Sequence, residues 1–263
     1  MSASILSVRD LGKRFGSMVA ARDITLSVPA HQTVGVIGAN GAGKTTFINM
    51  ITGHLRPTTG TIHFEERDIT GLPSRKIKRM GISRSFQVAQ IFGSLTVFEN
   101  MCAAAAIGRA PKHFMSHVLT PLRSRESIAE AETLLELFEI TPYRKMIAAT
   151  LPQGARKLLD IGMAVAGSPR LLLLDEPTSG ISIEEKFNLI EVAMSALRNR
   201  KITVLFVEHD MEIVKRFAER VLAFYDGTVI ADGPPTATLA DPRVEALISG
   251  PKVQRAASVV PHV

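Results

Sequence analysis

The segment GANGAGKT, residues 38–45, follows the apolar run TVGVI and precedes the helix-like stretch TTFINMITG. It matches the pattern G-x-x-x-x-G-K-[S/T] of a phosphate-binding loop, in the strand-to-helix context that this pattern requires. Gly38, Gly41 and Gly43 allow backbone angles that turn successive N–H groups toward phosphate oxygens, at the positive end of the next helix. Lys44 would place a positive charge on the outer phosphates. The segment therefore predicts a nucleotide-binding site.

A pair of carboxylates, Asp175 and Glu176, follows a run of four leucines. The leucines predict a buried strand, and ligands gather at the C-terminal ends of strands in open α/β sheets. Asp175 would hold Mg²⁺ there, together with the hydroxyl of Thr45 from the phosphate loop, and Glu176 would orient and partly deprotonate an attacking water. The plain alternative is an acidic surface pair after a core strand, which the phosphate loop disfavours.

A third apolar run, ITVLFV at residues 202–207, ends in Glu208 and His209. His209 could donate a hydrogen bond to the γ-phosphate or to the attacking water, or it could cap a helix or face solvent. Its context favours the first interpretation, because three apolar strands would then end in polar groups on the same edge of one sheet.

The elements that must position these groups follow from hydrophobic periodicity. The runs ITLSV (24–28) and TIHF (61–64) alternate apolar and polar residues, as half-buried antiparallel strands do. The continuous runs TVGVI, LLLL and ITVLFV are typical of parallel strands covered on both faces. Helical spacing places the core face of the segment EEKFNLIEVAMSALRNR on Phe187, Ile190, Met194 and Leu197. The order of strands and helices predicts an α/β fold with a mainly parallel sheet and an antiparallel β part.

The middle of the chain is helical in pattern, with Ile128, Ala131, Leu135 and Phe138 on one face. We expect one domain over residues 1–250, with a helical subdomain inserted at about 96–165. Near the end, an Asp-Gly pair between two apolar runs in VLAFYDGTVIA predicts a β-hairpin. The last residues, 251–263, show no periodicity and are expected to be a disordered tail.

Composition narrows the class of protein. The 263 residues carry a net charge of +6, which would suit nucleic acid or an anionic membrane surface, but the basic residues are scattered. Their densest cluster, SRKIKR at 74–79, is expected to be a solvated helix face. No run of 18 apolar residues occurs and no signal peptide is evident, so we expect a soluble chain. The single cysteine, Cys102, indicates a reducing compartment.

The order of these motifs resembles the ATP-binding cassette (ABC) family over about residues 5–248. The residues that carry the resemblance are GANGAGKTT (38–46), RSFQ ending in Gln87, LPQG (151–154), LLLLDEPTSG (171–180) and VEHD containing His209. Several motifs in the family's order are far more specific than any one of them.

The resemblance implies a P-loop ATPase that works as a dimer, with each ATP between the phosphate loop of one subunit and the signature segment of the other. Phe15 would stack on adenine, although a core aromatic is the alternative. Gln87 would contact Mg²⁺ and the water and would sense a membrane partner. The implied ATP contacts are Gly38, Asn40, Gly41, Gly43, Lys44, Thr45 and Thr46 in one subunit and Leu151, Pro152, Gln153 and Gly154 in the other. The implied metal ligands are Thr45, Gln87 and Asp175, and the implied catalytic residues are Glu176 and His209.

Within the family, the stretch DITGLPSRKIKRMGISRSFQ is similar to the ATPase subunits of branched-chain amino acid importers. That similarity implies integral membrane permease subunits, an external solute-binding protein and a place on the cytoplasmic face of the membrane. A soluble cassette ATPase acting on nucleic acid or ribosomes is the alternative, but tandem cassettes or long heptads are lacking. A P-loop kinase or GTPase would have no use for Gln87, the signature segment and His209 together. We therefore expect no nucleic-acid partner.

The chain departs from the family pattern in the signature segment. Pro152 stands where a serine usually offers its hydroxyl to the opposite γ-phosphate, and proline has neither hydroxyl nor N–H. One lost hydrogen bond, worth about 1 to 3 kcal/mol, would weaken dimer closure by roughly fivefold to a hundredfold. Pro152 suits the first turn of a helix, which could still aim its dipole at phosphate. The segment SGIS (179–182) also lacks the usual aspartate, which puts coupling between the two sites in question.

Overall fold

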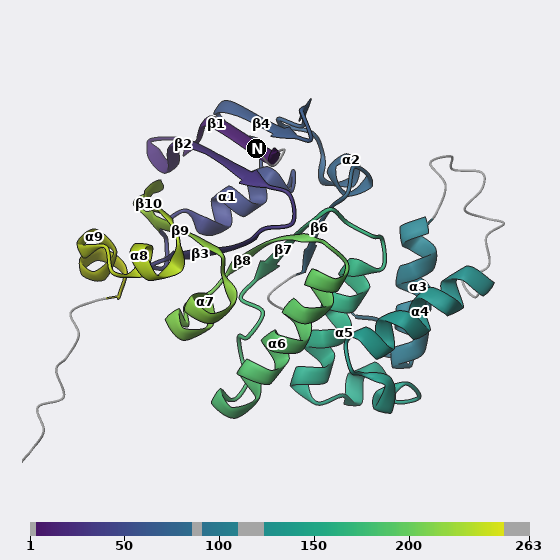
Figure 1. The fold of residues 1–263 in the computed structure, drawn as a ribbon. Coiled ribbons are helices and arrows are strands. Elements are labelled where there is room, and N and C mark those ends of the chain that lie inside the picture. The colour runs from purple at the N-terminus through teal and green to yellow at the C-terminus, as the bar shows by residue number, and fades with distance from the viewer. Residues whose placement is uncertain (1–3, 86–90, 110–123, 250–263) are drawn as a thin grey trace, which may run out of the picture.

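The computed structural model describes residues 4–85, 91–109 and 124–249 of the chain (Figure 1). A six-stranded sheet runs through the centre in the order β10-β9-β3-β8-β7-β6, parallel except for the β9–β10 pair. Its strands are β3 (Thr33–Gly38), β6 (Ile82–Ser85), β7 (Leu171–Asp175), β8 (Thr203–Val207), β9 (Arg220–Tyr225) and β10 (Thr228–Gly233). Every residue of β3 and β8 is buried, so the continuous apolar runs do form parallel strands covered on both faces.

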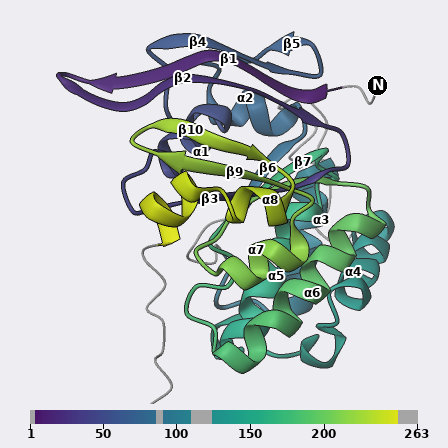
Figure 2. The ribbon, with the colours of Figure 1, turned by 60° about the vertical axis from the view of Figure 1, so that its left-hand side comes forward.

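A second, antiparallel sheet has the order β2-β1-β4-β5. Its strands are β1 (Ser4–Phe15), β2 (Met18–Pro29), β4 (Thr59–Phe64) and β5 (Arg67–Asp68). In β2, Ile24, Leu26 and Val28 are buried and the residues between them are exposed, which confirms the alternation predicted for a half-buried strand. Figure 2 shows this sheet as the outermost layer, with α1 (Lys44–Ile51) and α2 (Ser74–Arg79) below it.

The six-stranded sheet separates two hydrophobic clusters. One fills the space between this sheet, α1 and the antiparallel sheet, and the other lies under the helices on the opposite face. Successive leucines of β7 alternate between them, because side chains on a strand point to opposite faces: Leu171 and Leu173 join the first cluster, and Leu172 and Leu174 join the second. The strand that carries the acid pair is thus held from both sides.

The helices of the second face are α3 (Val97–Arg109), α4 (Arg125–Leu137), α5 (Gln153–Val165), α6 (Ile183–Asn199) and α7 (Met211–Phe217). Short turns at Thr141–Tyr143 and Ala148–Thr150 connect α4 to α5, and the last described elements are α8 (Pro235–Leu239), α9 (Pro242–Val244) and a short π-helix at Glu245–Ser249. The predicted faces of α4 and α6 pack into the second cluster, as expected. Because this cluster runs without a break from α3 and α4 to the sheet, the division into a helical subdomain at about 96–165 stays a prediction.

The Asp-Gly hairpin forms between β9 and β10. Asp226 and Gly227 both have positive φ, 45° and 75°, as a two-residue turn of this kind requires. The backbone N–H of Gly227 donates to the carbonyl of Ala42 at 3.1 Å, so the turn also supports the phosphate loop.

Cys102 is buried in the second cluster as an apolar residue. The predicted tail, 251–263, lies outside the residues that the structure describes. No helix among the described residues is long and apolar enough to cross a membrane.

Asn100 on α3 fixes the segment that leads into the helices. Its side chain is fully buried, accepts from the N–H of Phe92 at 2.8 Å and donates to the carbonyls of Phe92 and Thr96 at 3.0 and 2.9 Å. These bonds satisfy backbone groups that would otherwise be buried without partners.

We predict that Asn100→Ala lowers the free energy of unfolding by about 1 to 3 kcal/mol, because it leaves these backbone groups unpaired. Denaturant unfolding measures the change. Asn188→Ala, at an exposed position of α6, is the matched control and should stay within about 0.5 kcal/mol of the wild type. Equal effects of the two substitutions would contradict the role of Asn100.

Candidate functional site

The phosphate loop joins β3 to α1 and depends on its glycines. Gly38, Gly41 and Gly43 have φ of 153°, 82° and 100°, in the region that side chains disfavour. A Cβ atom on Gly38 would lie 2.4 Å from the carbonyl oxygen of Phe224, and one on Gly43 would lie 2.8 Å from that of Ala20. Gly43 caps α1 with no side-chain hydrogen bond, so the first N–H groups of the helix are free for an anion.

Lys44 lies at the centre of the loop and is 6% exposed. Its ammonium donates to the carbonyls of Gly38 and Ala39 at 2.6 and 2.9 Å. Burial lowers the pKa of Lys44, and the nearby carboxylates of Glu176 and Asp175 oppose that shift. The lysine charge therefore sits between the phosphate loop and the acid pair.

Asp175, the last residue of β7, is held by an arginine. Arg84 of β6 donates from Nη2 to Asp175 Oδ2 at 2.5 Å and from Nη1 to Asn49 Oδ1 of α1 at 2.6 Å. Both members of the ion pair are largely buried, with side chains 10% and 14% exposed. The sequence interpretation gave Arg84 no role, because the motif RSFQ directs attention to Gln87. Gln87 itself lies outside the described residues.

Glu176 and His209 meet across the ends of β7 and β8. His209 Nε2 and Glu176 Oε1 are 2.7 Å apart, so the two side chains share a hydrogen bond. Glu176 has a positive φ of 48°, and its N–H donates to the carbonyl of Val207 at 3.1 Å. This backbone conformation costs about 1 to 3 kcal/mol for a residue with a side chain, and it is typical of functional positions.

A second buried acid supports this pair. Glu208 is 4% exposed, and its carboxylate accepts from the N–H and the hydroxyl of Thr178 at 3.0 and 2.7 Å. Burial raises the pKa of Glu208, and the hydrogen bonds from Thr178 and His209 oppose that shift. The carboxylate joins the loop after β7 to the loop after β8. Sequence reasoning did not single out Glu208, because its partner Thr178 lies 30 residues away and nothing local connects the two residues.

A buried lysine on α5 completes the cluster of charges. Lys157 is 4% exposed, and burial lowers its pKa, whereas Asp160, Asp175, Glu208 and Glu176 oppose the shift. In the same helix, Asp160 accepts a hydrogen bond from Ser85 at 2.6 Å, at the end of β6. Neither residue was predicted as functional. Helical spacing alone would have indicated that both lie on the buried side of α5.

The phosphate loop, Glu176 and His209 face one cavity of about 340 Å³. Phe15 lines it as well and is 45% exposed, which rules out the alternative that it is a core aromatic. The predicted residues that line this cavity are Phe15, Asn40, Gly41, Gly43, Lys44, Thr45, Thr46, Glu176 and His209. Gly38 and Asp175 do not line this cavity; they are the last residues of β3 and β7.

The signature segment lies away from this cavity. Pro152 and Gly154 line a different cavity, of about 330 Å³, between α5 and the start of α6. Leu151 is buried, and the side-chain amide of Gln153 lies against Gly180, close enough that a Cβ there would be 2.3 Å from it. The sequence predicts a helix start that Pro152 suits, and α5 begins directly after this residue. Pro152 caps α5 with an extended ψ of 150°, and the helix begins at Gln153.

Oxygen atoms suited to a hard cation are present near the phosphate loop. Thr45 is exposed, and Asp175 uses Oδ2 for its hydrogen bond with Arg84, so Oδ1 is the oxygen that this bond does not use. In the described part of the chain, no three His, Cys, Asp or Glu side chains are grouped to hold a metal. A cation here would therefore take a hydroxyl, a carboxylate and phosphate oxygens, a donor set that Mg²⁺ accepts.

Known proteins are similar to this chain in sequence and in fold. Residues 21–179 match the family described as ABC transporter. The chain is 35% identical over 238 residues to the high-affinity branched-chain amino acid transport ATP-binding protein LivG of Salmonella typhimurium, covering 89% of this chain and 93% of that protein. It is 34% identical over 250 residues to the lipopolysaccharide export system ATP-binding protein LptB of Haemophilus influenzae, covering 94% and 98%.

A solved structure with a similar fold comes from the same family as these relatives. The ADP conformation of MJ1267, an ATP-binding cassette of an ABC transporter, superposes with a TM-score of 0.81 at 30% identity, covering 92% of this chain and 97% of that chain. The phosphate loop of this chain, the acid pair after β7 and the sequence match over most of its length lead to one conclusion. The chain belongs to the ABC transporter family, as an ATP-binding ATPase.

Proposed function

We propose that this chain is the ATP-hydrolysing subunit that drives import of branched-chain amino acids, or a related small solute, through separate membrane permease subunits. One observation carries the hydrolytic part: Glu176 and His209, at the ends of neighbouring strands, face the phosphate loop across one cavity. The relatives named for branched-chain amino acid transport support the choice of solute. By the same inference, the partners include an external solute-binding protein and no nucleic acid.

ATP binding begins at the phosphate loop. Backbone N–H groups at the start of α1 bind the phosphates, and Lys44 exchanges the carbonyls of Gly38 and Ala39 for phosphate oxygens. Phe15 lies at the rim of the cavity, where its exposed ring can stack on adenine. Thr45 and Asp175, with Gln87, would hold Mg²⁺, which supplies positive charge to the phosphate oxygens that become more negative during hydrolysis.

Hydrolysis uses the Glu176–His209 pair. The Glu176 carboxylate orients a water for in-line attack on the γ-phosphorus and takes up its proton as the new P–O bond forms and the bond to ADP breaks. The hydrogen bond to His209 and the backbone bond to Val207 hold this carboxylate in place. Glu208 lies deeper and is engaged by Thr178, so it supports the loops and does not reach the water.

A second copy or a related ATPase subunit would complete the site. The signature segment of one subunit, from Leu151 to Gly154, would meet the nucleotide of the other through the N-terminus of α5. Closure of this dimer on ATP and its opening after hydrolysis would move the permeases. The complex would lie at the cytoplasmic face of the membrane, attached through those permeases.

We predict that Glu176→Gln keeps ATP affinity but lowers the turnover of ATP by about a hundredfold or more, because the water loses its base. With ATP and Mg²⁺ the variant should accumulate as a dimer in sedimentation velocity. Asp226→Asn, at the exposed hairpin turn, is a control expected to keep normal turnover. Unchanged hydrolysis by Glu176→Gln would remove this residue from its role.

Adding a hydroxyl at the signature position should strengthen closure. Pro152→Ser, made in the Glu176→Gln background, is expected to tighten ATP-dependent dimerisation by roughly fivefold to a hundredfold, as one more hydrogen bond to phosphate would. Sedimentation equilibrium measures the dimer constant, and Pro152→Ala separates the hydroxyl from the loss of the ring. Equal constants for all three proteins would mean that the missing hydroxyl does not limit closure.

Reconstitution tests which solute is transported and in which direction. The chain, purified with its permeases in vesicles and supplied with the solute-binding protein, should drive ATP-dependent uptake of radiolabelled leucine, and Glu176→Gln should abolish it. ATP-dependent extraction of lipopolysaccharide without leucine uptake would favour an export role like that of LptB. Co-purification with RNA and a steep salt dependence would instead favour the alternative of a nucleic-acid ATPase.

A further inference from the structure

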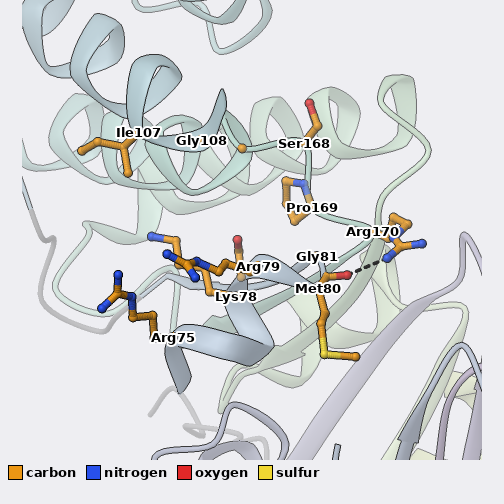
Figure 3. Close-up of a pocket in the computed structure, with 12 residues that line it drawn as sticks. Arg75, Lys78, Arg79, Met80, Gly81, Ile107, Gly108, Ser168, Pro169 and Arg170 are labelled. Atoms are coloured by element: carbon orange, nitrogen blue, oxygen red, sulfur yellow. Dashed lines mark hydrogen bonds between the residues drawn. The ribbon is translucent and has the colours of Figure 1, made fainter. Parts of the chain in front are cut away.

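A separate cavity of about 530 Å³ lies at the sheet edge opposite the phosphate loop (Figure 3). Its walls are α2, the start of β6, the end of α3 and the loop before β7. The nucleotide groups follow the C-terminal ends of β3, β7 and β8, whereas β6 and β7 begin at this cavity. A five-residue strand spans about 16 Å, and the two cavities share no lining residue. They are therefore distinct sites.

Three positive charges of α2 line this cavity. Arg75, Lys78 and Arg79 follow i, i+3 and i+4 spacing, so they share one face of the helix while Ile77 anchors the other. Figure 3 shows them between α2 and the end of α3. In the part of the chain that the structure describes, no acidic residue lines the cavity, and none of the three makes an ion pair or a side-chain hydrogen bond. The described lining of the cavity therefore carries an excess of positive charge.

A fourth cation, Arg170, also lines the cavity, but its charge is paired with other groups of the protein. Its Nη2 donates to the carbonyl of Met80 at 2.6 Å, the bond drawn in Figure 3. Its Nη1 forms an ion pair with Glu65, and its guanidinium lies 5.3 Å from the ring centroid of Phe64. These contacts hold Arg170 in the wall and match its charge before any ligand arrives.

The cavity also contains a serine hydroxyl. Ser83 on β6 lines it and is only 8% exposed. Its side chain has no hydrogen-bond partner among the residues that the structure describes. Because it lines the cavity, this hydroxyl can hydrogen-bond an oxygen of a ligand. This hydroxyl distinguishes the cavity from an ordinary charged surface.

We propose that this cavity is a second ligand site, which binds a small phosphorylated molecule. Guanidinium groups match phosphate oxygens with paired hydrogen bonds, and lysine adds a point charge. Arg75, Lys78 and Arg79 bind the phosphate groups, and Ser83 hydrogen-bonds the ligand from below. The volume lies in the usual range for small-molecule sites and exceeds what one phosphate fills, so the remainder of the ligand packs against the exposed side chain of Ile107 at the rim.

Calorimetric titration with inorganic pyrophosphate tests the site in the full-length chain. We expect two classes of binding, one at the phosphate loop that Lys44→Ala removes and one that this variant retains. Arg79→Gln should weaken the retained class about tenfold or more. Lys76→Gln removes the same charge from the same helix outside the cavity and should change it less than about twofold. Ser83→Ala, which changes no charge, should weaken it by about threefold or more.

The same variants identify the outcomes that overturn the proposal. Equal weakening by Arg79→Gln and Lys76→Gln, with none by Ser83→Ala, would indicate diffuse attraction to a basic surface. Loss of all binding in Lys44→Ala would leave only the phosphate-loop site. Binding to vesicles of phosphatidylglycerol in phosphatidylcholine that Arg79→Gln abolishes, without a second pyrophosphate class, would assign the cavity to a lipid headgroup. Absence of the phosphate-loop class alone would count against the proposed ATPase and leave this site standing.

Discussion

The ion pair between Arg84 and Asp175 is the contact on which the rest of the site depends. It joins three elements at once, because the same guanidinium reaches Asn49 of α1, the helix that begins at the phosphate loop. A carboxylate that is 14% exposed would be costly to leave without a partner, and breaking such a pair from one side costs about 3 to 5 kcal/mol. The arginine therefore links the edge strand β6, the carboxylate of Asp175 and the helix that follows the phosphate loop. Its strand also leads directly into the segment that contains Gln87.

Charge from α5 balances the acids that gather at this edge. Glu176, Glu208 and Asp175 all act on the buried ammonium of Lys157, and Asp160 of the same helix holds Ser85 at the end of β6. The helix that starts with the signature segment is thus tied electrostatically to the hydrolytic site of its own subunit. In a dimer, the N-terminus of this helix would face the other nucleotide. One rigid helix would then contact both sites.

Local patterns in the sequence were sufficient for the phosphate loop, the parallel strands, the hairpin at Asp226 and the acid pair. Each of these depends on neighbours in the chain: glycine conformations, apolar runs and residues that end strands. Arg84, Glu208 and Lys157 could not be predicted in the same way, because their partners are distant in sequence and a charged residue within an apolar element carries no local sign of its partner. Pro152 caps α5, and the helix begins at Gln153, so a proline next to a helical pattern did indicate where this helix begins. The roles predicted for the site residues in catalysis stay predictions.

The four leucines of β7 have a consequence for the order of the two acids. Side chains at successive positions enter opposite cores, yet all four are identical, so a slip of one residue would refill both cores with leucine along most of the strand. Such a slip would bring Glu176 to the place of Asp175 and move the base out of reach of His209. The same slip would also push the carboxylate of Asp175 into the fully buried place of Leu174, which is costly. The register is therefore set by the charged end of the strand, where Asp175 meets Arg84 and Glu176 meets His209, so these two contacts distinguish the two acids.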